Sequence, residues 1–135
     1  MSASNGTISG PEWLRDLKFD DKGLVTAVAI DNANGDVLML AHMNAEAVQK
    51  TLATGLMTYW SRSRKSLWVK GETSGNTQKL VSAHLDCDGD ALVFHVIAEG
   101  IGAACHEGYR SCFFREFKEG GWEIQGKPIA RANPH

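Results

Sequence analysis

Two apolar segments, LVTAVAI (24–30) and VLMLAH (37–42), flank the polar stretch DNANGD (31–36). The apolar segments are rich in β-branched and large aliphatic residues, which favour strands. Asn34-Gly35 is a dipeptide typical of tight hairpin turns. The sequence therefore predicts a β-hairpin here, and with it a β-rich domain.

One helix is predicted directly after this hairpin. Asn44 is a good N-cap, Glu46 falls in the first turn, and Gly55 is a natural stop. Between the two caps, AEAVQKTLAT (45–54) carries apolar residues at helical spacing. We expect a helix of about three turns.

Further strands are predicted downstream of the helix. The segments are 56–60, 67–70, 78–86, 91–98, 113–117 and 122–124. The segment 91–98 (ALVFHVIA) is apolar on both faces, which is typical of a central strand. With no repeat and no linker, we predict a mainly β fold with α+β character. It would be a single domain over 13–135 with a barrel-like sheet and one helix, after a flexible tail over 1–12. The pattern does not predict the strand order.

Composition limits the class of protein. The 135 residues carry a net charge of −2, with 43% hydrophobic and 22% charged residues, as in an ordinary globular domain. The charge gives no general attraction to nucleic acid or to an anionic membrane. No apolar run approaches the ~18 residues of a membrane helix, and the N-terminus lacks a signal-peptide pattern. We expect a soluble, cytoplasmic protein that binds neither nucleic acid nor membrane.

The chain has three cysteines, Cys87, Cys105 and Cys112, all in its last third. An odd number cannot pair fully, and disulfide frameworks belong to secreted proteins. The cluster indicates either a metal or reactive centre, or three buried small side chains. Position alone favours neither. With three thiolates, a zinc ion would keep a fourth position for water, as in catalytic sites.

Aspartates alternate in Asp86, Asp88 and Asp90. In an extended segment their side chains lie on one face, and Cys87 lies on the other. Carboxylates this close repel each other unless a cation neutralises them, and their oxygens suit magnesium or calcium. The alternative is a solvated acidic turn without a bound cation. When the three aspartates are the only observation, this alternative is favoured.

Two polar segments are candidates for binding an anion. The stretch WSRSRKSLW (60–68) has three cations and three hydroxyls that can hold phosphate oxygens, and its tryptophans can stack on a base. The second segment is ETSGNT (72–77). Each has the alternative of a solvated loop. His106, next to Cys105, is a fourth ligand, a general base or a polar loop residue.

Four stretches together resemble the phosphoribosyl-AMP cyclohydrolases of histidine biosynthesis. They are LMLAHMN (38–44), YWSRSRKSLWVKGETSGNTQ (59–78), LDCDGD (85–90) and ACHEGYRSCF (104–113). The resemblance spans roughly 23–114. It departs at Glu107, where the family usually has Thr, and at Tyr109, where it usually has Arg.

The resemblance implies a reaction and two metals. These enzymes hydrolyse the N1–C6 bond of the adenine ring of N1-(5-phosphoribosyl)-AMP by a zinc-activated water. About one zinc per chain is implied at Cys105 and Cys112, with Cys87 supplied by the other chain of a homodimer. Magnesium is implied at Asp86, Asp88 and Asp90. The implied fold is a β pseudo-barrel capped by a helix. The substrate-binding residues expected from the resemblance are Trp60, Arg62, Ser63, Arg64, Lys65, Glu72, Thr73, Ser74 and Asn76.

Chemistry assigns roles within this expectation. Three thiolates leave a zinc centre with excess negative charge, which weakens its pull on a water proton, so a general base is needed and His106 is the best candidate. Magnesium with Arg62, Arg64 and Lys65 would match the two phosphates. A zinc deaminase would need H-x-E and P-C-x-x-C, which are absent. A zinc module for RNA would be expected to carry net positive charge.

Overall fold

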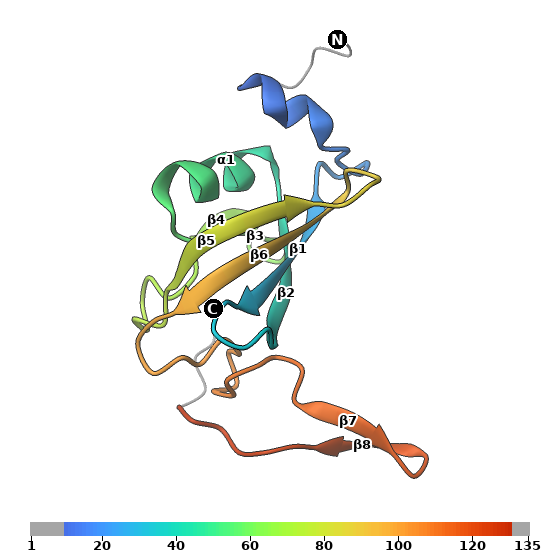
Figure 1. Cartoon of the computed structure of the whole chain (residues 1–135), viewed down its shortest axis with the longest axis vertical. Coiled ribbons are helices and arrows are strands. Elements are labelled where there is room, and N and C mark those ends of the chain that lie inside the picture. The colour runs from blue at the N-terminus through green and yellow to red at the C-terminus, as the bar shows by residue number, and fades with distance from the viewer. Residues whose placement is uncertain (1–9, 131–135) are drawn as a thin grey trace.

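A curled six-stranded sheet forms the centre of the computed structural model, which describes residues 10–130 (Figure 1). Its strands are β1 (Val25–Asp31), β2 (Val37–Met43), β3 (Thr58–Ser61), β4 (Ser66–Val69), β5 (Gln78–Leu85) and β6 (Ala91–Ala98). The order across the sheet is β4-β3-β2-β1-β6-β5. The prediction of a mainly β fold with a curled sheet is confirmed.

The predicted hairpin of β1 and β2 lies at the middle of this sheet. Val37 of β2 lies opposite Ile30, and Met43 lies opposite Val25. On its other edge β1 runs parallel to β6, with Thr26 opposite Ala91. The β6 strand is therefore an interior strand, as its apolar sequence predicts, with β5 antiparallel beside it.

The predicted helix is α1 (Ala45–Thr54), and it packs against β2 and β3. Asn44 Oδ1 accepts a hydrogen bond from the Ala47 N–H at 2.9 Å, and Gly55 closes the helix at φ +79°. Buried residues of α1 meet the inner face of the sheet, where Tyr59 and Phe94 are fully buried. The predicted caps are both confirmed.

Two smaller elements lie outside the main sheet. The 3₁₀ helix η1 (Glu12–Asp16) precedes β1, and β7 (Arg115–Lys118) pairs with β8 (Gly121–Ile124) in a separate hairpin that extends away from the body (Figure 1). Residues 1–9 of the predicted tail lie outside the described residues. No helix in the described part of the chain is long and apolar enough to span a membrane.

Candidate active site

The three aspartates lie in the turn that joins β5 to β6. Ligand oxygens of Asp86, Asp88 and Asp90 all lie within 4.8 Å of one another. The prediction that an extended strand aligns them is wrong, because residues 86–90 form a turn in which Gly89 adopts φ +77°. Side chains do not alternate in a turn, so alternation does not determine where Cys87 points. The carboxylates converge all the same, through the turn.

This turn is held by hydrogen bonds that the backbone donates. The N–H groups of Asp90 and Ala91 reach Asp86 Oδ1 at 3.1 and 3.4 Å. The Lys18 N–H bonds the Gly89 carbonyl at 2.7 Å, which fixes the turn to the segment after η1. A Cβ at Gly89 would lie 2.5 Å from the Asp16 carbonyl oxygen, so only glycine fits this approach.

The electrostatics of the turn favour a bound cation. A hydrogen bond with Asp86, and then the charge of Asp86, raise the pKa of Asp90. Partial desolvation is the largest influence on the pKa of Asp86 and raises it, but the N–H groups of Asp90 and Ala91 together bring it below its usual value. The two carboxylates therefore resist ionising together. Three oxygen donors this close fit magnesium or calcium.

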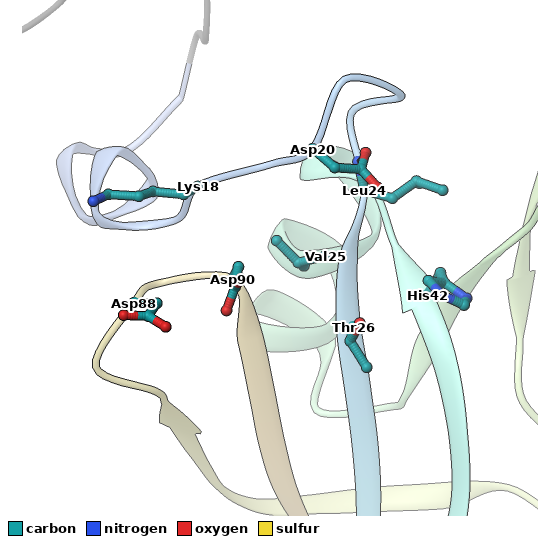
Figure 2. A pocket seen from close by; sticks show the side chains of 8 residues that line it. All are labelled: Lys18, Asp20, Leu24, Val25, Thr26, His42, Asp88 and Asp90. Atoms are coloured by element: carbon teal, nitrogen blue, oxygen red, sulfur yellow. The ribbon is translucent and has the colours of Figure 1, made fainter.

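A pocket of about 510 Å³ borders this turn. Figure 2 shows Asp88 and Asp90 at the β5–β6 turn, across the pocket from His42 on β2. Lys18 and Asp20, from the segment between η1 and β1, and Thr26 of β1 also belong to its polar lining. Asp20 Oδ1 accepts hydrogen bonds at 2.9 Å from the N–H groups of Leu24 and Lys22, and these bonds, that from Leu24 foremost, lower the pKa of Asp20.

The other two cysteines lie on a loop at the far end of β1 and β2. The Cys105 N–H bonds the Tyr109 carbonyl at 3.0 Å, which makes a tight turn, and the Cys112 N–H bonds the Leu38 carbonyl at 2.7 Å. Cys105 is buried and Cys112 is half-buried. Burial, and then the neighbouring Cys105, raise the pKa of the Cys112 thiol to about 12. A pair of thiols like this becomes a pair of thiolates only with a cation beside it.

Side chains on the same loop fix its position. Arg110 binds two carboxylates of the β1–β2 turn, Asp31 at 2.6 Å and Asp36 at 3.0 Å. Tyr109, at the position where the family usually has arginine, stacks on Phe114 with ring centroids 3.8 Å apart. Its side chain thus contributes to loop packing.

A second, open pocket of about 800 Å³ brings several of the predicted residues together. Its lining includes Trp60, Arg62, Ser63, His106 and Cys112. The structure thus places a candidate thiol ligand, the candidate base and part of the basic WSRSR segment around one space. His106 and Cys112 follow the 60–63 segment by about fifty positions in the sequence. The pocket therefore forms only when the sheet brings the two segments together.

The remaining predicted substrate residues lie outside the lining of this pocket. These are Arg64, Lys65, Glu72, Thr73, Ser74 and Asn76. Three of their side chains accept hydrogen bonds from backbone N–H groups: Glu72 from Val69 at 3.2 Å, Ser74 from Asn76 at 3.2 Å, and Asn76 from Ile101 at 3.0 Å. The last bond joins the 72–77 segment to the loop that leads to Cys105.

Trp68, one of the two tryptophans predicted to stack on a base, also lines the larger pocket, whereas no sequence prediction covered two further polar residues of its lining, Lys22 and His42. His42 also lines the smaller pocket, so the two spaces meet at this side chain. Burial, and then the charge of Arg62, lower the pKa of His42. A single polar residue within the apolar strand VLMLAHM was the signal that could have found it.

Cys87 lies apart from the other two cysteines of its own chain. It is exposed in the β5–β6 turn, beside the start of β1, whereas Cys112 is bonded to Leu38 near the end of β1. Along β1, the position beside Cys87 and the position beside Cys112 are about five residues apart, which corresponds to about 15 Å. Among residues 10–130, the aspartates alone form a group of three convergent metal-ligating side chains.

The chain is similar to known proteins of one family. The family model for phosphoribosyl-AMP cyclohydrolase matches residues 39–114. A phosphoribosyl-AMP cyclohydrolase of Chromobacterium violaceum is 56% identical over 110 residues, which are 82% of this chain and 83% of the relative. One of Cereibacter sphaeroides is 55% identical, over 84% of this chain and 93% of the relative. One of Marinobacter nauticus is 45% identical, over 97% of this chain and 94% of the relative.

The fold, the pocket and these relatives define an enzyme of the hydrolase class. More narrowly, the chain belongs to the phosphoribosyl-AMP cyclohydrolase family. The matched segment contains all three cysteines and every lining residue of the larger pocket except Lys22. Of the smaller pocket it contains His42, Asp88 and Asp90.

Proposed function

We propose that this enzyme opens the adenine ring of N1-(5-phosphoribosyl)-AMP by hydrolysing its N1–C6 bond, a step of histidine biosynthesis. The observation that supports this most directly is the larger pocket, where Cys112, His106, Trp60 and Arg62 line one space within the segment that matches the family. Ribosylation at N1 makes the ring electron-poor, so C6 accepts attack by water.

The proposed zinc centre uses Cys105 and Cys112 of one chain with Cys87 of the partner subunit. Two observations support a shared centre: Cys87 is exposed, and it lies about 15 Å along the strands from the other two cysteines. Three thiols are the donor set of a zinc site with one open position. Zinc, when bound, supplies Lewis-acid activation of a water molecule.

His106 is the proposed general base. It follows Cys105 directly, is exposed, and lines the larger pocket with Cys112. From there its imidazole takes a proton from the attacking water. Trp60 offers a ring face for the adenine to stack on, on the same wall as Arg62.

The carboxylate turn and the basic segment are the proposed phosphate sites. Asp86, Asp88 and Asp90 would hold magnesium, which neutralises them and binds phosphate oxygens. Arg62 lies on the pocket wall, and the exposed Arg64 and Lys65 follow it in the chain. His42 lines both pockets, and one substrate molecule would extend past this side chain from one pocket to the other.

A homodimer in the cytoplasm completes the proposal. The β7–β8 hairpin exposes Phe117, Trp122 and Ile124, and its Trp122 lines a space next to Cys112. A two-stranded hairpin is only marginally stable alone, so a partner surface here would stabilise it. Three free thiols suit a reducing compartment.

The direct test is an absorbance assay of ring opening with purified protein and phosphoribosyl-AMP. With magnesium present throughout, we expect turnover that a zinc-selective chelator abolishes and added zinc restores. Cys112→Ser should lose both zinc and turnover. Absence of turnover in the zinc-loaded wild-type protein would refute the proposed reaction.

A further inference from the structure

Two polar side chains, Tyr59 and Gln78, form a buried hydrogen bond next to the larger pocket. The Tyr59 hydroxyl donates to Gln78 Oε1 at 2.8 Å, and the two residues are 0% and 1% exposed. Tyr59 belongs to β3, and Gln78 is the first residue of β5. Burial raises the pKa of Tyr59, so its hydroxyl stays protonated and remains a donor. Neither residue belongs to the lining of the larger pocket.

Each member of this pair contacts one residue that does line the larger pocket. Gln78 Nε2 donates to Met39 Sδ at 3.3 Å, and Met39 is part of the lining. The centroid of the Tyr59 ring lies 5.3 Å from that of the Trp68 ring, which is also part of the lining, at an interplanar angle of 43°. Met39 lies on β2 and Trp68 on β4. One hydrogen bond between β3 and β5 therefore reaches two lining residues on two further strands.

The pair is more polar than packing alone requires. Burying a hydroxyl and an amide costs free energy, which their hydrogen bond offsets with only a small net gain. A thioether sulfur, the acceptor for Gln78 Nε2, is a weak one. Apolar side chains of similar size would fill the same space without this cost. A buried hydrogen bond adds direction, because it fixes orientations that apolar contacts leave free. Met39 gains most from this, since methionine has three rotatable bonds.

We propose that Tyr59 and Gln78 are positioning residues that hold Trp68 and Met39 in the orientation in which they contact the adenine ring of the substrate. This inference rests on the proposed function. A nucleotide base stacks on aromatic rings, and a polarisable thioether makes favourable contacts with an aromatic ring. The pair itself touches neither the substrate nor the reacting atoms. Its loss should therefore weaken substrate binding more than it slows the chemical step.

Steady-state assays of Tyr59→Phe with phosphoribosyl-AMP, together with its Tm, test this inference. The variant keeps the ring and removes the hydroxyl, so Gln78 Oε1 loses its donor. We expect KM to rise about tenfold, the effect of losing a base–aromatic stack. The value of kcat should stay within about twofold of wild type, because the groups proposed to act on the reacting atoms are unchanged. Tm should fall, because a buried acceptor is left unsatisfied.

The double variant Tyr59→Phe/Gln78→Met separates positioning from stability. Replacing both partners of a buried hydrogen bond by apolar groups of similar shape is nearly neutral for stability. Tm should therefore return toward that of wild type. KM should stay raised, because no hydrogen bond then orients Met39. A wild-type KM in Tyr59→Phe or in the double variant would overturn the inference.

Thr51→Val is the matched control, because Thr51 makes a buried hydrogen bond away from both pockets. Thr51 is 0% exposed on α1, and its Oγ1 accepts from the Thr58 N–H at 2.9 Å. This variant should have a lower Tm and an unchanged KM. An equal rise of KM in Thr51→Val overturns the inference, because KM would then follow stability alone. If Tyr59→Phe does not fold, the comparison of the double variant with wild type decides. Failure of the proposed reaction gives a different result, since wild type would then show no turnover.

Discussion

The guanidinium of Arg110 holds the carboxylate of Asp31 at 2.6 Å and thereby joins the cysteine loop to the end of β1. Arg110 lies between Cys105 and Cys112 in the sequence, so this ion pair anchors the segment that joins the two cysteines. A second carboxylate, Asp36, lies 3.0 Å from the same guanidinium. The loop geometry therefore depends on an ion pair between residues 79 positions apart.

Asp31→Asn should weaken this connection in a way that depends on pH. The Ala33 N–H, and then Arg110, hold the pKa of Asp31 below its usual value near 3.8. Because the folded-state pKa is the lower one, the stabilisation is present above the unfolded-state pKa and is lost as pH falls through the folded-state value. We expect Asp31→Asn to lower the free energy of unfolding by about 1 kcal/mol at pH 7. Urea unfolding of both proteins should show this difference shrinking below pH 3.8.

Glu12→Gln is the control for this experiment. Glu12 also pairs with an arginine, Arg15 at 3.1 Å, but its side chain is 87% exposed and the pair is local. Exposed ion pairs contribute little to stability. The free energy of unfolding of Glu12→Gln should therefore match that of wild type both at pH 7 and below pH 3.8. A pH-independent difference between wild type and Asp31→Asn would contradict the role assigned to the ionised carboxylate.

Asp90→Asn should change the response of the protein to magnesium. A hydrogen bond with Asp86, and then the charge of Asp86, raise the pKa of Asp90. The turn is therefore favoured at pH below the usual pKa of an aspartate and is disfavoured as pH rises through the raised pKa. Metal-free Asp90→Asn should therefore have a Tm at pH 7 no lower than that of wild type. Magnesium should raise the Tm of wild type in a concentration-dependent way and that of Asp90→Asn much less.

The magnesium experiment has an internal control in zinc content. Asp90→Asn keeps the size of the side chain and leaves Cys87, the zinc ligand proposed in this turn, unchanged, so zinc content should stay near that of wild type. A second variant of the same turn, Asp88→Asn, should have lower turnover than wild type, and its turnover should depend less on magnesium. Equal magnesium-induced rises in Tm for wild type and Asp90→Asn would rule out the turn as the cation site.

Local sequence signals predicted the hairpin and the helix. They could not predict the order of the strands, which depends on pairing between segments far apart in the sequence. The hairpin around Asn34-Gly35 and the helix from Asn44 to Gly55 depend on turn and cap residues, whose effects act within a few positions. The parallel pairing of β1 with β6 joins strands about sixty residues apart. No periodicity in either strand encodes that choice.

The same distinction holds for the candidate site. The aspartates could be found from sequence because they are neighbours, although the reason given for their convergence was wrong: a turn at Gly89 brings them together. His42 was missed because the role of a strand residue depends on which residues the sheet places beside it. The separation of Cys87 from Cys112 likewise follows from strand register.

His106→Ala should separate catalysis from metal binding. If His106 is the general base, the variant keeps zinc and loses about 10²–10⁴-fold in turnover. The acidic limb of its pH–rate profile should change as well, because that limb reports the ionisation of the base. Zinc analysis and steady-state assays of the purified variant measure both. His84→Ala, on the exposed strand β5 and outside both pockets, is the matched control and should keep full activity. Loss of zinc from His106→Ala would make His106 a ligand instead.

Co-expression of two inactive variants should restore activity if the zinc centre is shared. In a dimer of one Cys87→Ser chain and one Cys105→Ser chain, one centre collects both defects and the other collects neither. Random pairing makes about half of the dimers mixed, so the mixture should recover about a quarter of wild-type activity. The doubly tagged mixed dimer, purified through both tags, should have about half of wild-type activity and one zinc ion in its intact centre. Each variant expressed alone is the control and should be inactive. If all three cysteines came from one chain, every centre would carry a defect. An inactive, zinc-free mixed dimer would therefore refute the shared centre, and the cyclohydrolase reaction would still have to be judged by its own assay.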